Sequence, residues 1–200
     1  CINKDAVIKK LKKILEDPSI KKIGQNIKFD FIVFFKHGIT LSSMEDTMLM
    51  SYVLDAGKNR HNMDTLSEIH LGHKTISFKE IVGTGKKEIN FSEVDLDKAK
   101  DYAAEDADIT FRLYKKFIKN LKLEKMINIY EIFEKPLIEI LAFMEIEGVE
   151  IDSKFLKSLS SKFEKKIQKL EKEVFKISKK EFNIASPKQL GEIIYNDLKI

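Results

Sequence analysis

The sequence predicts a helix-rich α/β protein with two or three short strands. A hydrophobic fraction of 43% in 200 residues is enough for a real core. Apolar residues recur at helical spacing over most of the chain, and two short apolar segments bounded by turn residues, 20–25 and 41–44, have the length of strands. Helices therefore dominate, and the strands are confined to the first quarter of the chain.

Composition narrows the function classes only partly. Charged residues make up 34% of the chain with both signs interspersed, and the net charge of +4 is compatible with a polyanionic partner without requiring one. The single cysteine, Cys1, excludes a disulfide within the chain and a cysteine-based zinc site, which favours a reducing, cytoplasmic setting. The apolar stretches are short and interrupted by charge, so we expect no membrane partner.

The first half of the chain divides into short elements separated by turn residues. The apolar pattern predicts, in order, a helix over 5–16, a strand over Ile20–Gln25, a helix over Phe29–Lys36, a strand over Leu41–Met44, and helices over Thr47–Leu54 and Met63–Leu71. Gly83–Lys87 is expected to be a loop; it lacks the spacing and the Lys-Ser/Thr ending of a phosphate-binding loop.

The second half is expected to be helical throughout. A helix is predicted over Asp95–Leu121, and another has Pro136 in its first turn and Gly148 as its stop. Asp152 is placed to cap a long helix with a coiled-coil-like apolar stripe, and Ser186 to cap a last helix with Gln189 completing a capping box. The change of character after Lys122 puts a domain boundary near 125–135, giving domains 1–125 and 126–200.

The first segment with chemical potential is Gly24–Asp30, where a strand runs into a helix. Asp30 would lie at the lip of a sheet, where a carboxylate can reach a metal, and Gln25 and Asn26 could hydrogen-bond a substrate from the same turn. The alternative is that Asp30 only caps the following helix.

The second segment is Tyr102–Asp108 on a predicted helix. Tyr102 and Asp106 are four residues apart and therefore share one face, where a phenol and a carboxylate can hold a divalent metal and orient its bound water. The alternative is a buried tyrosine with a solvated acidic edge.

Together the two segments, N-x-x-F-D and Y-x-x-x-D, resemble the second and third motifs of the DEDD exonuclease superfamily, in its tyrosine-bearing branch. Further segments resemble the 3′→5′ exonuclease domain and the opening of the polymerase domain of family A DNA polymerases, the bacterial polymerase I type. These are 24–39, 45–52, 60–64, 73–78, 102–108, 136–152 and 186–190. The resemblance covers nearly the whole chain in order.

The resemblance implies a ribonuclease H-like α/β exonuclease fold that lacks its first strands, followed by the all-helical start of a polymerase domain. It implies a proofreading exonuclease that hydrolyses phosphodiesters with two divalent ions (Mg or Mn, with Zn an option) about 4 Å apart. Asp106 and Asp30 would be metal ligands, and Tyr102 would orient the attacking water. The partner would be DNA, bound as a single-stranded primer 3′ end, and the protein a monomer.

Four further residues are implied to handle the 3′ end of the primer: Gln25, Asn26, Arg60 and Phe78. The charged fork of Arg60 suits phosphate, and Phe78 suits stacking on a base.

The family's first motif, an acidic D-x-E pair, is absent upstream of Asp30. We attribute this absence to truncation and expect the 200-residue species to be a poor nuclease. Two alternatives stay open: a stand-alone ribonuclease D-like exonuclease, and a catalytically dead exonuclease-like scaffold. His70 and His73, three residues apart, have no third ligand nearby, so a metal site there is not favoured.

Overall fold

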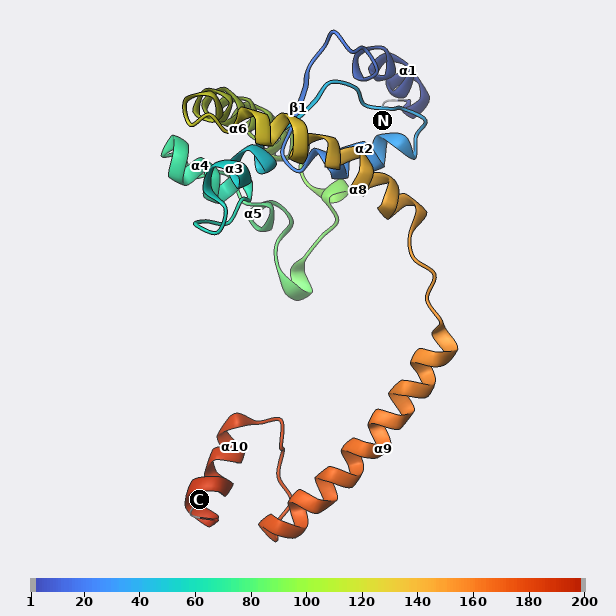
Figure 1. Ribbon diagram of the computed structural model, residues 1–200, viewed down its shortest axis with the longest axis vertical. Coiled ribbons are helices and arrows are strands. Elements are labelled where there is room, and N and C mark those ends of the chain that lie inside the picture. Colours follow the sequence, from blue (N-terminus) through green and yellow to red (C-terminus); the bar gives the residue numbers. More distant parts are fainter. Residues whose placement is uncertain (1–2, 199–200) are drawn as a thin grey trace. The chain divides into compact units, whose positions relative to one another are not determined.

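The computed structural model describes residues 3–198, apart from the side chain of Lys86, and has two compact units, Cys1–Gly148 and Val149–Ile200 (Figure 1). Cys1, on which the expectation of a reducing setting depends, lies outside the described residues. No helix among residues 3–198 is long and apolar enough to cross a membrane.

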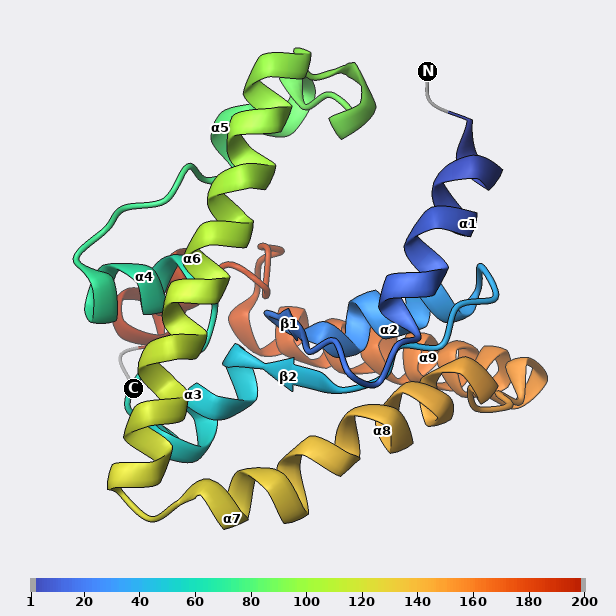
Figure 2. The same cartoon turned by 90° about the horizontal axis from the view of Figure 1, so that it is seen from above.

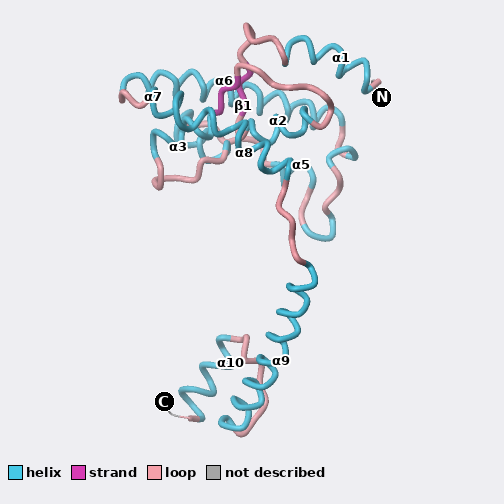
Figure 3. Tube along the Cα trace, turned by 45° about the vertical axis from the view of Figure 1, so that its right-hand side comes forward, coloured by secondary structure: helices cyan, strands magenta, loops and turns pink. Residues whose placement is uncertain are grey.

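Helices make up most of both units (Figure 3). The elements of the first unit are, in order, α1 (Lys4–Leu15), β1 (Lys22–Gly24), α2 (Ile27–Phe35), β2 (Met44–Asp46), α3 (Thr47–Asp55), α4 (Met63–Leu71), α5 (Phe78–Val82), η1 (Gly85–Lys87), η2 (Phe91–Glu93), α6 (Leu96–Leu123), α7 (Ile127–Ile129), η3 (Tyr130–Glu134) and α8 (Lys135–Glu147). The second unit contains α9 (Ser153–Ser178), α10 (Pro187–Gly191) and η4 (Glu192–Asp197).

The two strands form a parallel pair in which Lys22 lies opposite Met44 and Gly24 opposite Asp46. The strand predicted over Leu41–Met44 is therefore wrong in position, because the pairing begins only at Met44. The sequence hid the true strand because Glu45 and Asp46 are charged, yet both are almost fully buried, at 2% and 1% exposure. Helix α2 makes the crossover between the strands (Figure 2).

Two hydrophobic clusters form the core of the first unit. The larger cluster joins α3, α4 and α6 and contains Met50, Leu66, Ile109, Leu113, Phe117, Leu121 and Tyr130. The smaller one lies where α2 packs on α8 and contains Ile27, Phe31, Leu41, Met44, Ile138 and Ala142. Because α8 supplies part of this second cluster, residues 126–148 pack with the exonuclease-like elements.

A buried polar network fastens the same segment to the sheet. The Tyr130 hydroxyl donates to Glu45 Oε2 (2.9 Å) and accepts from the Asp46 N–H (3.0 Å). Glu45 Oε1 also pairs with Lys135 (3.0 Å) and Lys21 (3.1 Å), so its buried charge is compensated. The compact units consequently separate at Gly148, while the assignment of 126–200 to a second domain of the intact protein remains a prediction.

As predicted, Pro136 lies in the first turn of α8 and Gly148 follows the last residue of this helix, but other helical turns precede α8 directly. Residues 127–147 run through α7, the π-helical turn η3 and α8, with Pro136 at the second position of α8. Proline has no N–H to give to the preceding turn, and a π-helical turn is a common way to accommodate that loss inside a continuous helix.

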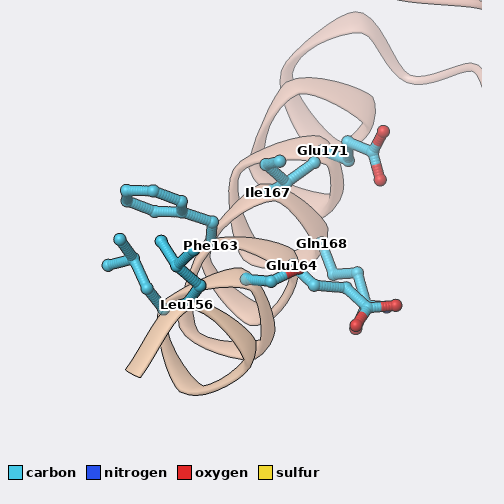
Figure 4. A pocket seen from close by; sticks show the side chains of 8 residues that line it. Leu156, Phe163, Glu164, Ile167, Gln168 and Glu171 are labelled. Carbon is cyan, nitrogen blue, oxygen red and sulfur yellow. The ribbon is translucent and has the colours of Figure 1, made fainter. Parts of the chain in front are cut away.

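In the second unit, Asp152 caps α9 as predicted, accepting from the Phe155 N–H at 2.9 Å. Ser186 caps α10, but the predicted capping box is not formed, because the Gln189 side chain accepts from the Asn183 N–H instead. The apolar stripe of α9 is exposed: Leu156 and Phe163 project from one side of the helix, and Glu164 and Gln168 from the other (Figure 4).

Candidate active site

Asp30 and Asp106 line one open cavity of about 580 Å³ in the first unit, although 76 positions separate them in the sequence. One wall is the β1–α2 segment, and the other is the middle of α6. The remaining lining residues are Lys21, Ile23, Gly24, Gln25, Met63, Ala107, Thr110 and Phe111. The structure thus brings together the two carboxylates that the sequence predicted as metal ligands.

The two carboxylates have different surroundings. Asp106 is half-buried, and its Oδ1 atom is buried without a hydrogen-bond partner among the described residues. Burial raises the pKa of Asp106, and the neighbouring charges of Glu105 and Asp64 raise it further. A hydrogen bond from Tyr102 lowers it, but burial has the larger effect. The Asp30 residue is exposed to solvent. Protein atoms around the cavity nevertheless partly desolvate its carboxyl group, and this raises its pKa as well.

Tyr102 lies one helical turn before Asp106, as the spacing predicted. Burial raises the pKa of Tyr102 to about 12, and the adjacent charge of Asp106 acts in the same direction. The phenol is therefore protonated at neutral pH and can donate a hydrogen bond.

The turn before Asp30 is held by a residue to which sequence reasoning gave no role. Asp46, at the end of β2, accepts the backbone N–H groups of Asn26 and Ile27 (3.0 Å each) and of Met48 (2.8 Å). Its carboxylate therefore satisfies the amino ends of both α2 and α3. With this cap α2 begins at Ile27, two residues before the predicted Phe29, so Asp30 lies within its first turn and does not cap it. An acidic residue directly before a helix was the available signal.

Of the three other polar residues predicted to bind the primer, Gln25, Asn26 and Arg60, only Gln25 lines this cavity. Gln25 lines it, but its amide is engaged: Nε2 donates to the His61 carbonyl (2.7 Å), and Oε1 accepts from the Thr47 hydroxyl. Asn26, in the left-handed region with φ 58°, lines a smaller neighbouring cavity of about 200 Å³ instead. Arg60 is exposed in the α3–α4 connection and does not line the cavity.

Phe78 does not line the cavity, but its ring lies next to that of Tyr102 in an aromatic cluster. The rings of Phe78, Phe91 and Tyr102 lie with centroids 6.0–6.1 Å apart, and the Phe78 and Phe91 rings are close to parallel at 21°. Phe78 and Phe91 are both exposed, at 49% and 41%. Phe91 was not predicted; it is the first residue of the short 3-10 helix η2, where the sequence has no periodic pattern, and only this contact identifies it.

The two histidines make contacts within the protein. His70 packs edge-on against Phe117 (4.9 Å), and His73 contacts Glu105 at 2.7 Å. Across the residues that the structure describes, no three His, Cys, Asp or Glu side chains converge closely enough to hold a metal ion.

A family model described as 3′-5′ exonuclease, for the type associated with DNA polymerase A, matches residues 1–122, more than half of the chain. The chain belongs to this 3′-5′ exonuclease family. The cavity that holds Asp30 and Asp106 lies inside the matched range, as do Tyr102 and the whole aromatic cluster. The family's model ends at the carboxyl end of α6, but similarity to known proteins continues beyond it.

Curated relatives match almost the whole chain. DNA polymerase I of Rhizobium leguminosarum is 43% identical over 189 residues, which are 94% of this chain and 19% of the relative. DNA polymerase I of Pseudomonas aeruginosa is 39% identical over 98% of this chain and 22% of its own length. The chain therefore spans about a fifth of the length of these relatives.

Solved structures support the fold of this exonuclease family member. The POL domain of Pol1 from M. smegmatis, in complex with DNA primer-template and dNTP, has a TM-score of 0.74 at 20% sequence identity. The match covers 99% of the present chain and 31% of the Pol1 chain. A nuclease in its apo form has a TM-score of 0.57, and the match covers 72% of the present chain and 68% of the nuclease chain. At this identity the likeness concerns the fold, helix-rich α/β with a small sheet; the ribonuclease H-like assignment stays a prediction.

Proposed function

We propose that this chain is part of a DNA polymerase I and that its cavity is the proofreading site, which removes mismatched 3′ nucleotides from a primer by 3′→5′ hydrolysis. The observation that carries the proposal is the single cavity shared by Asp30 and Asp106, with Tyr102 beside Asp106. The continued similarity of polymerase I relatives past residue 122 supports a polymerase context over a stand-alone ribonuclease D-like enzyme.

The carboxylates fit a divalent metal such as Mg²⁺ or Mn²⁺. Asp106 Oδ1 is a buried acceptor without a hydrogen-bond partner among the described residues, and an oxygen in this state is suited to a hard cation. Asp30 and Asp106 would hold the ions, which would lower the pKa of bound water and stabilise the leaving oxygen. Further ligands are required, because no three metal-binding side chains converge within the described range.

The chain's own residues then have defined tasks. Tyr102, protonated at neutral pH, has a single O–H, which would turn from the Asp106 carboxylate to the attacking water and orient it. Phe78 and Phe91 offer exposed rings on which bases of a single-stranded 3′ end can stack. The exposed guanidinium of Arg60 would contact a phosphate outside the cavity, Gln25 would contact the primer end from the cavity wall, and Asn26 would do so from the neighbouring cavity.

Asp30 and Asp106 are the two carboxylates of the described residues that line the cavity, and two are too few to hold two metal ions firmly. We therefore propose that the 200-residue chain by itself degrades DNA poorly and that the site works in the intact protein. We propose that the intact protein is a cytoplasmic monomer with DNA as its partner.

The test is Asp106→Ala in the intact protein. We expect loss of Mg²⁺-dependent shortening of a mismatched primer by at least a hundredfold, with primer extension unchanged, since removal of a group that acts in the transition state lowers kcat. Asp108→Ala, an exposed acidic neighbour paired only with Arg112, is the matched control and should leave both activities unchanged. Undiminished shortening in the Asp106 variant would contradict the proposal, and a wild-type protein that extends the primer but never shortens it would support the scaffold alternative.

A further inference from the structure

Glu105 lies between the two catalytic candidates on α6 but points to a different partner. Its carboxylate accepts the Ile76 backbone N–H at Oε2 (2.6 Å) and contacts His73 Nε2 at Oε1 (2.7 Å). Both of its oxygens are thus engaged by the connection between α4 and α5, two residues before Phe78. The side chain is only 17% exposed.

The connection that Glu105 holds is tied down along its length. Ser67 Oγ donates to the His73 carbonyl (2.8 Å), and Thr75 Oγ1 donates to Asp64 Oδ1 (2.7 Å). Ser77 then caps α5 with a full capping box, and Phe78 is the first residue of that helix. The only contact in this series that comes from α6 is the one made by Glu105, one residue from Asp106.

We propose that Glu105 is a positioning residue that fixes the base-stacking ring of Phe78 against Tyr102, and so holds the surface on which the 3′ base of the primer stacks. The inference rests on the proposed exonuclease function. The inference follows from the helical spacing, since Tyr102 and Glu105 are three residues apart on α6 and share a face. The Phe78 ring contacts Tyr102, and the α4–α5 connection that leads to Phe78 is bound by Glu105.

The chemistry of the contact favours positioning over catalysis. Although burial opposes it, the hydrogen bonds from Ile76 and His73 hold the pKa of Glu105 below its usual range. Each of its oxygens already contacts a group of the α4–α5 connection, which is the arrangement of a structural contact.

The experiment uses the intact protein and a primer whose mismatched 3′ nucleotide is 2-aminopurine, a base whose emission changes when it stacks. Binding is followed in EDTA, without hydrolysis, and turnover is followed separately with Mg²⁺. Glu105→Ala should weaken 3′-end binding and raise KM about tenfold, the effect of losing a hydrogen bond to a charged group, while kcat at saturation stays within about twofold. Glu105→Gln should restore most of this, because an amide can accept from Ile76 and donate to a neutral His73.

A double-mutant cycle with Phe78→Ala decides whether Glu105 acts through that ring. Glu105→Ala should add nothing to Phe78→Ala, because the ring that it positions is already gone. Independent, additive effects of the two changes would overturn the inference, as would a fall in kcat with unchanged stacking. If the Glu105→Ala protein does not fold, His73→Ala removes one of the two contacts and is read by the same criteria. A wild-type protein that binds and stacks the 3′ base but does not shorten the primer would refute the exonuclease function alone.

Discussion

Replacing Asp46 should loosen the turn that carries Asp30, and the size of the effect follows from three hydrogen bonds. Asp46→Ala leaves the N–H groups of Asn26, Ile27 and Met48 without their acceptor. The bond to Ile27 is buried, so its loss costs about 2 kcal/mol, and the two half-buried bonds, which water can partly replace, cost about 0.5 kcal/mol each. The sum is about 3 kcal/mol, or roughly a hundredfold in the opening equilibrium.

Native-state hydrogen exchange of the intact protein measures this directly. Peptides spanning residues 24–31 should lose about a hundredfold in protection, whereas peptides from the middle of α6 should change little. Asp95→Ala is the matched control, because Asp95 also caps a helix by accepting two N–H groups, at 3.1 and 3.3 Å, but on an exposed surface. Its cost should stay near 1 kcal/mol and leave residues 24–31 unaffected. Protection within threefold of wild type in the Asp46 variant would refute the reasoning.

Three further predictions concern titratable groups. Tyr102→Phe should lower kcat for 3′-end hydrolysis about a hundredfold and leave the shape of the pH–rate profile unchanged below pH 10, because the phenol, with a pKa of about 12, does not titrate there. Mg²⁺ affinity, measured by calorimetry, should rise with pH through the raised carboxyl pKa values of Asp106 and Asp30, and this dependence should weaken in Asp106→Asn, where only Asp30 still titrates. Burial and Lys116 lower the pKa of His70, so its folded form resists protonation; stability should fall as pH drops below 6.5, and His70→Phe should flatten this slope in pH-dependent exchange of α4.

Helices with local signals were predictable from the sequence. Met63–Leu71 has the predicted bounds, and the cap of α9 by Asp152 is confirmed. Both depend on contacts within a few residues, which propensity and spacing describe well. The spacing of Tyr102 and Asp106 is of the same kind, since i and i+4 share a face in any helix.

Features set by distant partners were not predictable in this way. The position of β2 depends on pairing with β1, and its charged residues resemble a surface segment until Tyr130, Lys135 and Lys21 are seen to neutralise Glu45. The same holds for Phe91, whose role is visible only from rings that are 11 and 13 positions away in the sequence. Asp30 and Asp106 were recognised as a pair through family resemblance, because no local pattern shows that they share a cavity.

Two carboxylates that accept backbone N–H groups hold the segments around the site. Asp46 holds the turn that carries Asp30, and Glu105, on α6 itself, holds the α4–α5 connection that leads to Phe78. A metal-binding carboxylate is attracted by cations and repelled by its neighbours, so it needs a frame that does not move when charge enters the cavity. Backbone amides provide such a frame, because their dipoles are fixed and their hydrogen bonds to an ionised acceptor are strong. Loss of Asp46 should therefore disturb Asp30 and the metal, whereas loss of Glu105 should disturb Phe78 and the bound base, and the two defects should add in a double variant.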